Sequence, residues 1–226
     1  MTFSYDWMKD DLDIEDSKSS PSSGEKRYYG VVVGRVINPI DPLMLGRVQV
    51  QLPFIDSVDL SPWARVAVAM AGKNYGSFFI PIPGDEVLVA FEHGDTNVPY
   101  IIGSLWNTMA SPPVSGPGMG VFKRVIRTPL GHEIEFDDMT QSITITSNTK
   151  QKVKLGIEGI EVTSSPGNAT VKVESSGNIS IQGQTIDIKG STIKMTASTI
   201  DINGSGTTSV SAGGSCNIKG GKVNIN

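Results

Sequence analysis

The densest cluster of residues that could do chemistry is the segment His132-Glu-Ile-Glu-Phe-Asp-Asp138. Imidazole and carboxylate groups bind metal ions, and strand alternation would place Glu133, Glu135 and Asp137 on one face and His132 on the other. A threefold assembly could bring three copies of His132 together as ligands. Solvated charges on the outside of a strand are the favoured interpretation. We therefore expect no metal site, with His132 as the one candidate ligand.

The other reactive side chains are isolated in the sequence. His93 lies in a Glu-His-Gly-Asp turn, and Cys216, the one cysteine, lies among small residues and is expected to be a packed side chain. The glycines of the tail lie between strands, so they do not form a phosphate loop. Carboxylate pairs for glycoside hydrolysis stay open, but no cleft-forming domain is evident. We expect no catalytic residue, no cofactor and no enzymatic activity.

Composition excludes several classes of protein. The 226 residues include 19 basic and 23 acidic side chains, a net charge of −4, whereas a nucleic-acid binder needs a basic stripe. No apolar run approaches the ~18 residues of a membrane span. The first 16 residues hold six acids and one Lys, unlike a signal peptide. We expect a soluble protein, made in the cytoplasm without a signal peptide, that binds no nucleic acid.

The last part of the chain carries a repeat. No aromatic residue follows Phe136, and Gly, Ser and Thr dominate from Met139 onward, a composition typical of disorder. Apolar pairs nevertheless recur every seven residues, and the two members of a pair are two residues apart, which is strand spacing rather than helix spacing. We predict short strands separated by tight turns. Earlier, looser copies of the pair are Ile143-Thr-Ile145, Val153-Lys-Leu155, Ile160-Glu-Val162 and Val171-Lys-Val173, and a later copy is Val223-Asn-Ile225.

Strands of this kind have one apolar face and need partners to cover it. A single-chain solenoid takes about 20 residues per coil to enclose a core, more than a seven-residue unit supplies. Three chains, each giving one strand to a layer, can enclose a common axis. We therefore predict an intertwined trimeric β-helix, or β-prism. Its predicted trimer core is Ile179, Ile181, Ile186, Ile188, Ile193, Met195, Ile200 and Ile202.

The middle of the chain predicts a small all-β barrel. Five short runs alternate in polarity or are rich in β-branched residues, with turn residues between them, which suits an OB-like barrel; a sandwich is the alternative. Gly34 and Gly30 indicate bulges or a bend. Tyr29, Trp63, Phe91 and Trp106 are expected in the core. The expected strand regions are 28–40, 46–52, 63–69, 85–91 and 99–106, and residues 72–76 are expected to be a loop.

Composition also predicts the domain boundaries. Ser, Gly and Pro cluster after the acidic start and again after the barrel, as linkers do. The four predicted parts are an acidic N-terminal segment with a flexible linker at 1–26, the OB-like barrel at 27–108, a Pro/Gly linker at 109–126 and the trimeric β-helix at 127–226.

Six motifs carry a resemblance to a known family. They are Gly30-Val-Val-Val-Gly-Arg-Val36, Asp41-Pro-Leu-Met-Leu-Gly-Arg-Val-Gln-Val50, Trp63-Ala-Arg-Val66, Pro81-Ile-Pro-Gly-Asp-Glu-Val87, Pro99-Tyr-Ile-Ile-Gly-Ser104 and Arg127-Thr-Pro-Leu-Gly-His-Glu-Ile-Glu-Phe-Asp-Asp138. With this order of parts, the chain resembles the central spike of contractile injection systems, such as phage baseplate spikes of the gpV type and the C-terminal half of VgrG proteins.

The resemblance implies a structural role. A spike of this family plugs the tail tube and punctures the target-cell envelope, which it touches transiently, as part of a phage tail or of an injection particle that is released from the cell. The implied partners are a hub ring protein at the barrel end, with Trp7 as the expected contact, and a PAAR-type cap at the tip. The expected cap contacts are Val223, Ile225 and Asn226.

Three features of the family are not expected here. The chain is too short for the ring domain that precedes the barrel in VgrG, so a separate hub is expected, and the linker leaves no room for a lysozyme domain. The His-x-His motif that binds iron at the apex of several phage spikes is absent, because the last histidine is His132. The alternative functions are a trimeric tail fibre or adhesin, and a cell-wall hydrolase.

Overall fold

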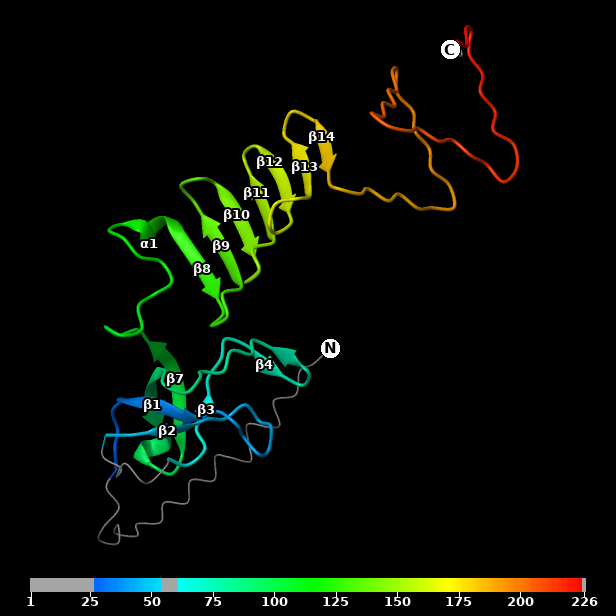
Figure 1. Cartoon of the computed structure of the whole chain (residues 1–226). Helices are drawn as coiled ribbons and strands as arrows, with labels where there is room; N and C mark the ends of the chain where they lie inside the picture. The colour runs from blue at the N-terminus through cyan, green and yellow to red at the C-terminus, as the bar shows by residue number, and fades with distance from the viewer. Residues whose placement is uncertain (1–26, 54–60, 225–226) are drawn as a thin grey trace, which may run out of the picture. The chain divides into compact units, whose positions relative to one another are not determined.

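The computed structural model describes residues 27–53 and 61–224. It divides into a unit that ends at Asn148 and a second unit that begins at Thr149. Figure 1 shows that almost every regular element is a β-strand. The predicted all-β class, an OB-like barrel followed by the strands of a prism, is confirmed.

The barrel sheet contains five strands in the order β2-β1-β6-β7-β3. Neighbouring strands are antiparallel except β3 and β7, which pair in parallel. All five predicted strand regions contain one of these strands. Their bounds are β1 Val32–Asn38, β2 Gln49–Gln51, β3 Arg65–Val66, β6 Glu86–Phe91 and β7 Pro99–Leu105.

The barrel core follows directly from strand alternation. In β6, every second side chain is buried, starting at Val87. Gly34 lies inside this core, where a Cβ atom would come within 3.1 Å of Leu52 and 3.2 Å of Val89, so the strands approach closely only because the side chain is absent. The buried apolar residues are Val36, Val48, Val50, Leu52, Ala64, Val87, Val89, Phe91 and Ile101.

Two expectations for the barrel are wrong. Residues 72–76 form part of a small hairpin, β4 Ala71–Gly72 and β5 Tyr75–Gly76, rather than a loop, because Asn74 adopts a positive φ of 63° that closes a tight turn. Tyr29 and Trp106 are not in the core: they are 77% and 70% exposed, since they lie just outside the ends of β1 and β7. Phe91 is buried and Trp63 is half-buried.

Beyond the barrel, the first unit contains one helical turn and three more strands. The turn is α1 Met119–Phe122, and β8 Lys123–Arg127 follows it at once, so a strand begins inside the segment that composition identified as a linker. Strand β9 Glu133–Asp137 pairs antiparallel with β8 and with β10 Ser142–Thr146. A short 3-10 turn, η2 Glu92–Gly94, connects β6 and β7.

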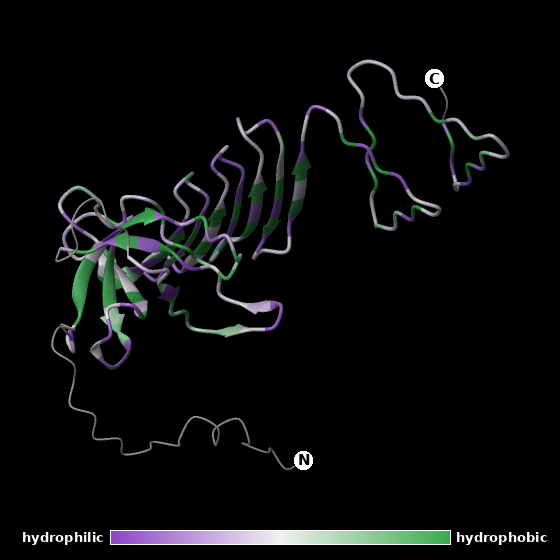
Figure 2. Cartoon of the chain, turned by 90° about the horizontal axis from the view of Figure 1, so that it is seen from below, coloured by the Kyte–Doolittle hydropathy of each residue, from purple (hydrophilic) through white to green (hydrophobic). Residues whose placement is uncertain are grey.

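The second unit opens with four antiparallel strands in sequence order. Neighbouring strands here are successive segments of one chain. They contain the predicted apolar pairs of this region, and green, apolar residues recur along them and along the tail that follows (Figure 2). Their bounds are β11 Lys152–Gly156, β12 Gly159–Thr163, β13 Thr170–Glu174 and β14 Ile179–Gln182.

After β14, the described tail, residues 183–224, contains no helix and no paired strand. The chain instead bends at regular intervals, at Gln184, Ser191, Ser198 and Ser205, which are seven residues apart. The tight turns predicted between the apolar pairs are therefore present. The strands predicted between the turns lack a backbone partner within the single chain, and a strand requires such a partner to form its hydrogen-bond ladder.

Candidate functional site: an apolar sheet face without a partner

The four strands of the second unit align their apolar residues in two cross-strand rows. Val162 lies opposite Val153 and Val171, and the same row continues to Ile181. The second row joins Leu155, Ile160, Val173 and Ile179 in the same way. Because alternate residues of a strand point to opposite sides, both rows lie on one face of the sheet.

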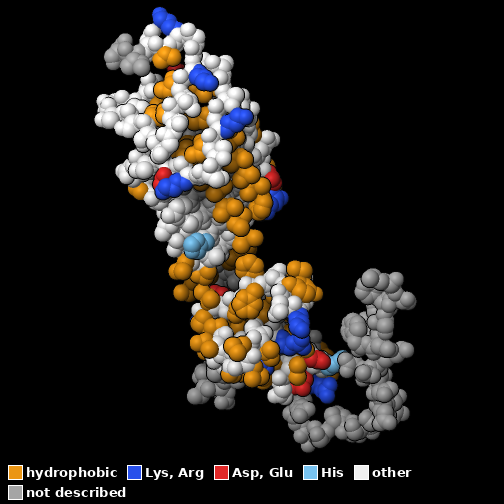
Figure 3. Space-filling model, turned by 90° about the vertical axis from the view of Figure 1, so that its right-hand side faces the viewer, with side chains coloured by type: hydrophobic (Ala, Val, Ile, Leu, Met, Phe, Trp, Pro, Cys, Tyr) orange, Lys and Arg blue, Asp and Glu red, His pale blue; other side chains and the backbone are white. Residues whose placement is uncertain are grey.

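That face is open to solvent in the single chain. The exposed fraction is 42% for Val162, 39% for Val173 and 69% for Ile179. Orange, apolar side chains are accordingly visible at the surface along these strands (Figure 3). A contiguous row of half-exposed aliphatic side chains differs from the single exposed residues found on any soluble protein, and it marks an interaction surface.

The opposite face of the same sheet is polar. Lys154, Glu161 and Lys172 lie side by side across β11, β12 and β13, and the Lys172 ammonium is 3.3 Å from the Glu161 carboxylate. Opposite charges in directly facing positions stabilise a sheet modestly and remain hydrated. The sheet therefore has one face for water and one face for an apolar partner.

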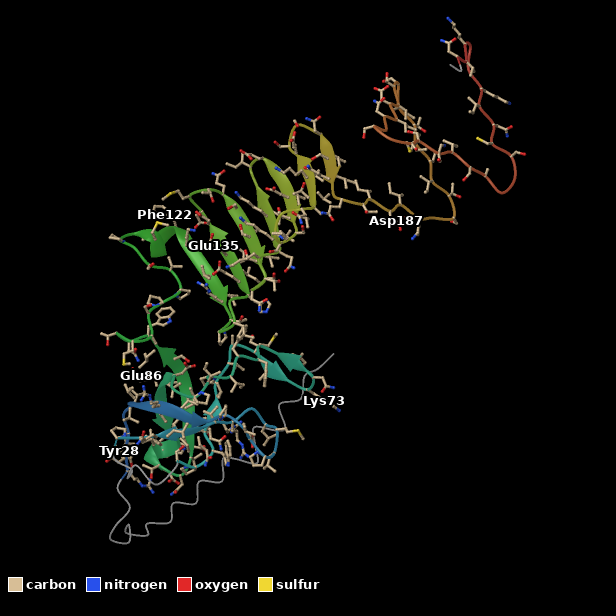
Figure 4. All side chains as sticks on the ribbon, viewed as in Figure 1. Tyr28, Lys73, Glu86, Phe122, Glu135 and Asp187 are labelled. Atoms are coloured by element: carbon tan, nitrogen blue, oxygen red, sulfur yellow. The ribbon has the colours of Figure 1, made fainter. Side chains whose placement is uncertain are left out.

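Strands β8, β9 and β10 repeat this division. Ile134 lies opposite Ile126 on one side and Ile145 on the other, and it is 36% exposed. On the other face, the Lys123 ammonium lies 2.9 Å from Glu135 and 3.4 Å from Asp137. Glu135 is labelled on its strand in Figure 4.

These contacts shift the pKa values of the charged residues on the polar face of β8 and β9. Backbone hydrogen bonding from Thr140 is the main cause that lowers the pKa of Asp137, and the Lys123 side chain adds to it. The hydrogen bond to Glu135 raises the pKa of Lys123. Both groups therefore keep their charges at neutral pH. Asp137 is only 8% exposed and is paired with Lys123, so the expectation of a solvated charge is wrong at this position.

His132 lies just before β9 and is exposed. Its backbone N–H donates to the Thr128 hydroxyl at 3.0 Å, and its Nδ1 accepts from the backbone N–H of Asn148 at 3.4 Å. Among residues 27–53 and 61–224, no three His, Cys, Asp or Glu side chains gather as a metal site would require.

The predicted core residues of the tail are also exposed in the single chain. Ile186 is 51% exposed, Ile188 68%, Met195 63% and Ile202 69%, while Ile181 in β14 is 56% exposed. Ile193 and Ile200 are half-exposed at 56% and 47%. Their assignment to a trimer core stays a prediction, and their exposure is what that prediction requires of an isolated chain.

The predicted partner contacts fall largely outside the described residues. Trp7, the expected hub contact, and Ile225 and Asn226, two of the expected cap contacts, all lie there. The third cap contact, Val223, is described and is 51% exposed.

The barrel carries a feature that the sequence analysis missed, a loop tied by Asp41. The Asp41 carboxylate accepts hydrogen bonds from the backbone N–H groups of Leu43, Leu45 and Arg47 at 3.0, 3.0 and 3.3 Å. It also accepts two bonds from the Arg47 guanidinium at 2.9 and 2.8 Å. The Arg47 bond is the largest cause that holds the pKa of Asp41 far below its ordinary value. This network fixes a loop whose tip, Met44, is 90% exposed.

An apolar hollow of about 480 Å³ lies beside this loop. Its lining includes Leu45, Val66, Met70, Phe78 and Ile80. It contains no charged side chain, and its polar side chains are those of Asn74, Tyr75 and Ser77. The Asp-Pro pair at position 41 signals a turn, but the sequence did not indicate that the carboxylate would bind its own loop.

Residues 32–106 match the family of type VI secretion system and phage-baseplate injector OB domains. This range includes the whole five-stranded barrel sheet described above. The chain therefore contains an OB domain of the injector type, and its sequence is similar to VgrG spike proteins of type VI secretion systems. The predicted resemblance is thus confirmed.

Curated relatives extend the similarity of this chain past the barrel. The actin cross-linking toxin VgrG1 of Vibrio cholerae serotype O1 is 29% identical over 190 residues, 80% of this chain and 15% of that protein. The spike protein VgrG3 of Vibrio cholerae is 35% identical over 106 residues, 43% of this chain and 10% of its own. VgrG1a of Pseudomonas aeruginosa is 46% identical over 57 residues, covering 25% of this chain and 9% of VgrG1a. The chain therefore spans less than a fifth of these relatives.

No helix within residues 27–53 and 61–224 is long and apolar enough to cross a membrane.

Proposed function

We propose that three copies of this chain form the central spike of a contractile injection machine, in which the apolar sheet faces line a shared axis. The observation that carries the proposal is the open apolar face of β11 to β14. Its two rows include seven side chains that are 39–69% exposed. Covering each gains about 1 kcal/mol, half the value of a full aliphatic burial, or about 7 kcal/mol per chain. The seven are Leu155, Ile160, Val162, Val171, Val173, Ile179 and Ile181.

The bends of the tail support a threefold arrangement. Each straight stretch between two bends carries one apolar pair, such as Ile186 and Ile188, and then turns. A chain that turns after every such pair describes the sides of a closed polygon, with the apolar residues directed inward. Three chains, offset by one third of a turn, supply every side of a triangular prism at each level. This arrangement gives each tail strand the neighbours that the single chain lacks.

In the machine, the barrel faces the tube and the prism points at the target. We propose that the spike plugs the tail tube and is driven through the target-cell envelope when the machine fires. The match of residues 32–106 to injector OB domains supports the placement of the barrel. The prism suits puncture because each strand is hydrogen-bonded on both sides and few bulky side chains protrude.

We also propose two partners for this spike. A hub ring protein binds at the barrel end through the acidic N-terminal segment that contains Trp7. A PAAR-type cap binds the segment from Lys219 to Asn226. Relatives that are named as spike proteins of type VI secretion systems support membership in such a complex without identifying either partner.

Electron microscopy of the native particles tests the proposal. Particles that carry a small epitope tag after Gly118, in the segment between barrel and prism, are labelled with antibody fragments. Label on the tail axis, below the tube, is expected. Label on fibres around the baseplate would support a tail fibre instead and would contradict the proposal.

A further inference from the structure

The outward positions of the tail alternate in charge at the repeat spacing. Asp187, Lys194 and Asp201 each lie between the two apolar residues of a pair, and they are seven residues apart. Because alternate residues point to opposite sides, these three side chains face outward if the apolar pairs face inward. Asp187 is labelled on the extended tail in Figure 4, and its side chain is 63% exposed.

The bends make the seven-residue geometry repeat closely. At Gly183 and at Gly190, the Cβ position lies 3.6 and 3.4 Å from the carbonyl oxygen two residues ahead. The same position lies 4.0 Å from the Cγ1 of Ile186 and 3.7 Å from that of Ile193, respectively. Two successive units therefore turn the same corner in the same way, which is what a chain that winds regularly around an axis requires.

The way each chain winds around the axis determines which residues of different chains become neighbours. Each bend carries a chain from one face of the prism to the next and raises it by one layer. With three chains, the strand directly above a given strand on the same face belongs to another chain and is one repeat further along the sequence. Both strands run in the same direction around the axis, so they are parallel. Residue i of one chain then lies beside residue i+7 of its neighbour.

We infer that Asp187 of one chain, Lys194 of a second and Asp201 of the third form a ladder of alternating charge on each face of the prism. The inference rests on the proposed trimer. The ladder predicts that the partner of the outward tail positions is another copy of the chain, aligned so that residue i lies beside residue i+7. A slip by one repeat would place Lys194 either beside Lys194 of the neighbouring chain or beside Ser180 and Thr208, so the charges select the correct alignment.

Lys189 is the control position for Lys194. It lies on the same outward face, and its ammonium is 2.5 Å from the Asp187 carboxylate of its own chain. Its neighbours at a spacing of seven are Gln182 and Thr196, which carry no charge. A charge change at Lys189 therefore removes the intrachain partner of Asp187 but breaks none of the proposed contacts between chains.

The first test compares Lys194→Asp with Lys189→Asp in the full chain. Lys194→Asp converts six attractive contacts per trimer into repulsive ones, so the trimer association constant is expected to fall at least about a hundredfold at low salt. The loss should shrink in 1 M NaCl, where the Debye length is about 3 Å. Lys189→Asp should lower the constant by less than about tenfold. Equal effects of the two variants would overturn the inference.

The second test measures the register with disulfides. In a Cys216→Ser background, the pair Asp187→Cys and Lys194→Cys places the Cα atoms of the two cysteines about 4.8 Å apart on adjacent strands of different chains, within the Cα–Cα range that a disulfide spans. Oxidation is expected to give a covalent trimer on a non-reducing gel. The control pair, Asp187→Cys with Asp201→Cys, lies two layers apart and should not close.

The outcomes separate the ladder from the trimer. A chain that is trimeric by light scattering but forms no covalent trimer through residues 187 and 194 would refute the ladder and leave the proposed function intact. A chain that is monomeric by light scattering would refute both.

Discussion

Ile188→Asp is the most informative single substitution, because the same side chain is exposed in one chain and enclosed in the proposed trimer. In the isolated chain, Ile188 is 68% exposed, so a carboxylate at this position stays hydrated and costs little free energy. In the trimer, three copies would lie on the axis. Losing the burial of three such side chains removes about 3–6 kcal/mol, taking two thirds of a full burial for each. Three unpaired charges in an apolar interior cost several kcal/mol more for each copy.

The expected result is loss of the trimer without unfolding of the barrel. Size-exclusion chromatography at several protein concentrations measures the oligomeric state. Tryptophan fluorescence of the barrel during urea unfolding measures the stability of the barrel. Thr196→Asp is the matched control, because it adds the same charge at an outward position and next to Lys189 of a neighbouring chain. An Ile188→Asp protein that stays trimeric with an unchanged urea midpoint would refute the reasoning.

Further predictions concern the Asp41 loop, two glycines of the second unit and the proposed partners. Asp41→Asn is expected to lower stability at neutral pH. The pKa of Asp41 in the fold lies below its ordinary value of 3.8, so the stability that the ionised carboxylate contributes is present above about pH 4 and is lost as the pH falls. The unfolding free energies of wild type and variant should therefore converge in acid. A difference that stays constant with pH would contradict this. Gly159→Ala is expected to cost about 2 kcal/mol or more, because φ is +127° and a Cβ atom would lie 2.0 Å from the Val173 carbonyl oxygen. Gly177→Ala, with φ at +92° and no atom within 4 Å, should cost less in the same urea titration. Deleting residues 1–24 should abolish co-purification of the hub. Deleting residues 219–226 should release the cap while the trimer persists. If mass spectrometry finds the same co-purifying proteins after both deletions, both assignments are contradicted.

Local pattern was sufficient to predict most strands. Alternation gave the five barrel strands, and the paired aliphatic residues located β10 to β14, because a half-buried strand needs an apolar residue at every second position. Strand β8 was missed because its two apolar residues, Val125 and Ile126, are adjacent and flanked by basic residues, with no alternation. Trp106 was misplaced because an aromatic residue at the end of a strand has no neighbouring strand to cover it.

The candidate site was likewise predicted only in part. The sequence predicts which residues are apolar and which face they share, and the exposed rows on β11 to β14 agree with it. It did not predict the Asp41 network, because that depends on the path of a loop in which Met44 adopts a positive φ of 55°. The strands at Ile186, Ile193 and Ile200 have no partner within one chain, so neither the sequence nor the single chain displays the backbone ladder that would complete them.

The account depends most on the claim that the apolar sheet face is covered by two other copies of the chain. Multi-angle light scattering of the intact protein, measured across a range of concentrations in dilute buffer, tests this claim directly. The account predicts a single species of about three times the 24.1 kDa chain. A stable, folded species of 24.1 kDa would contradict it.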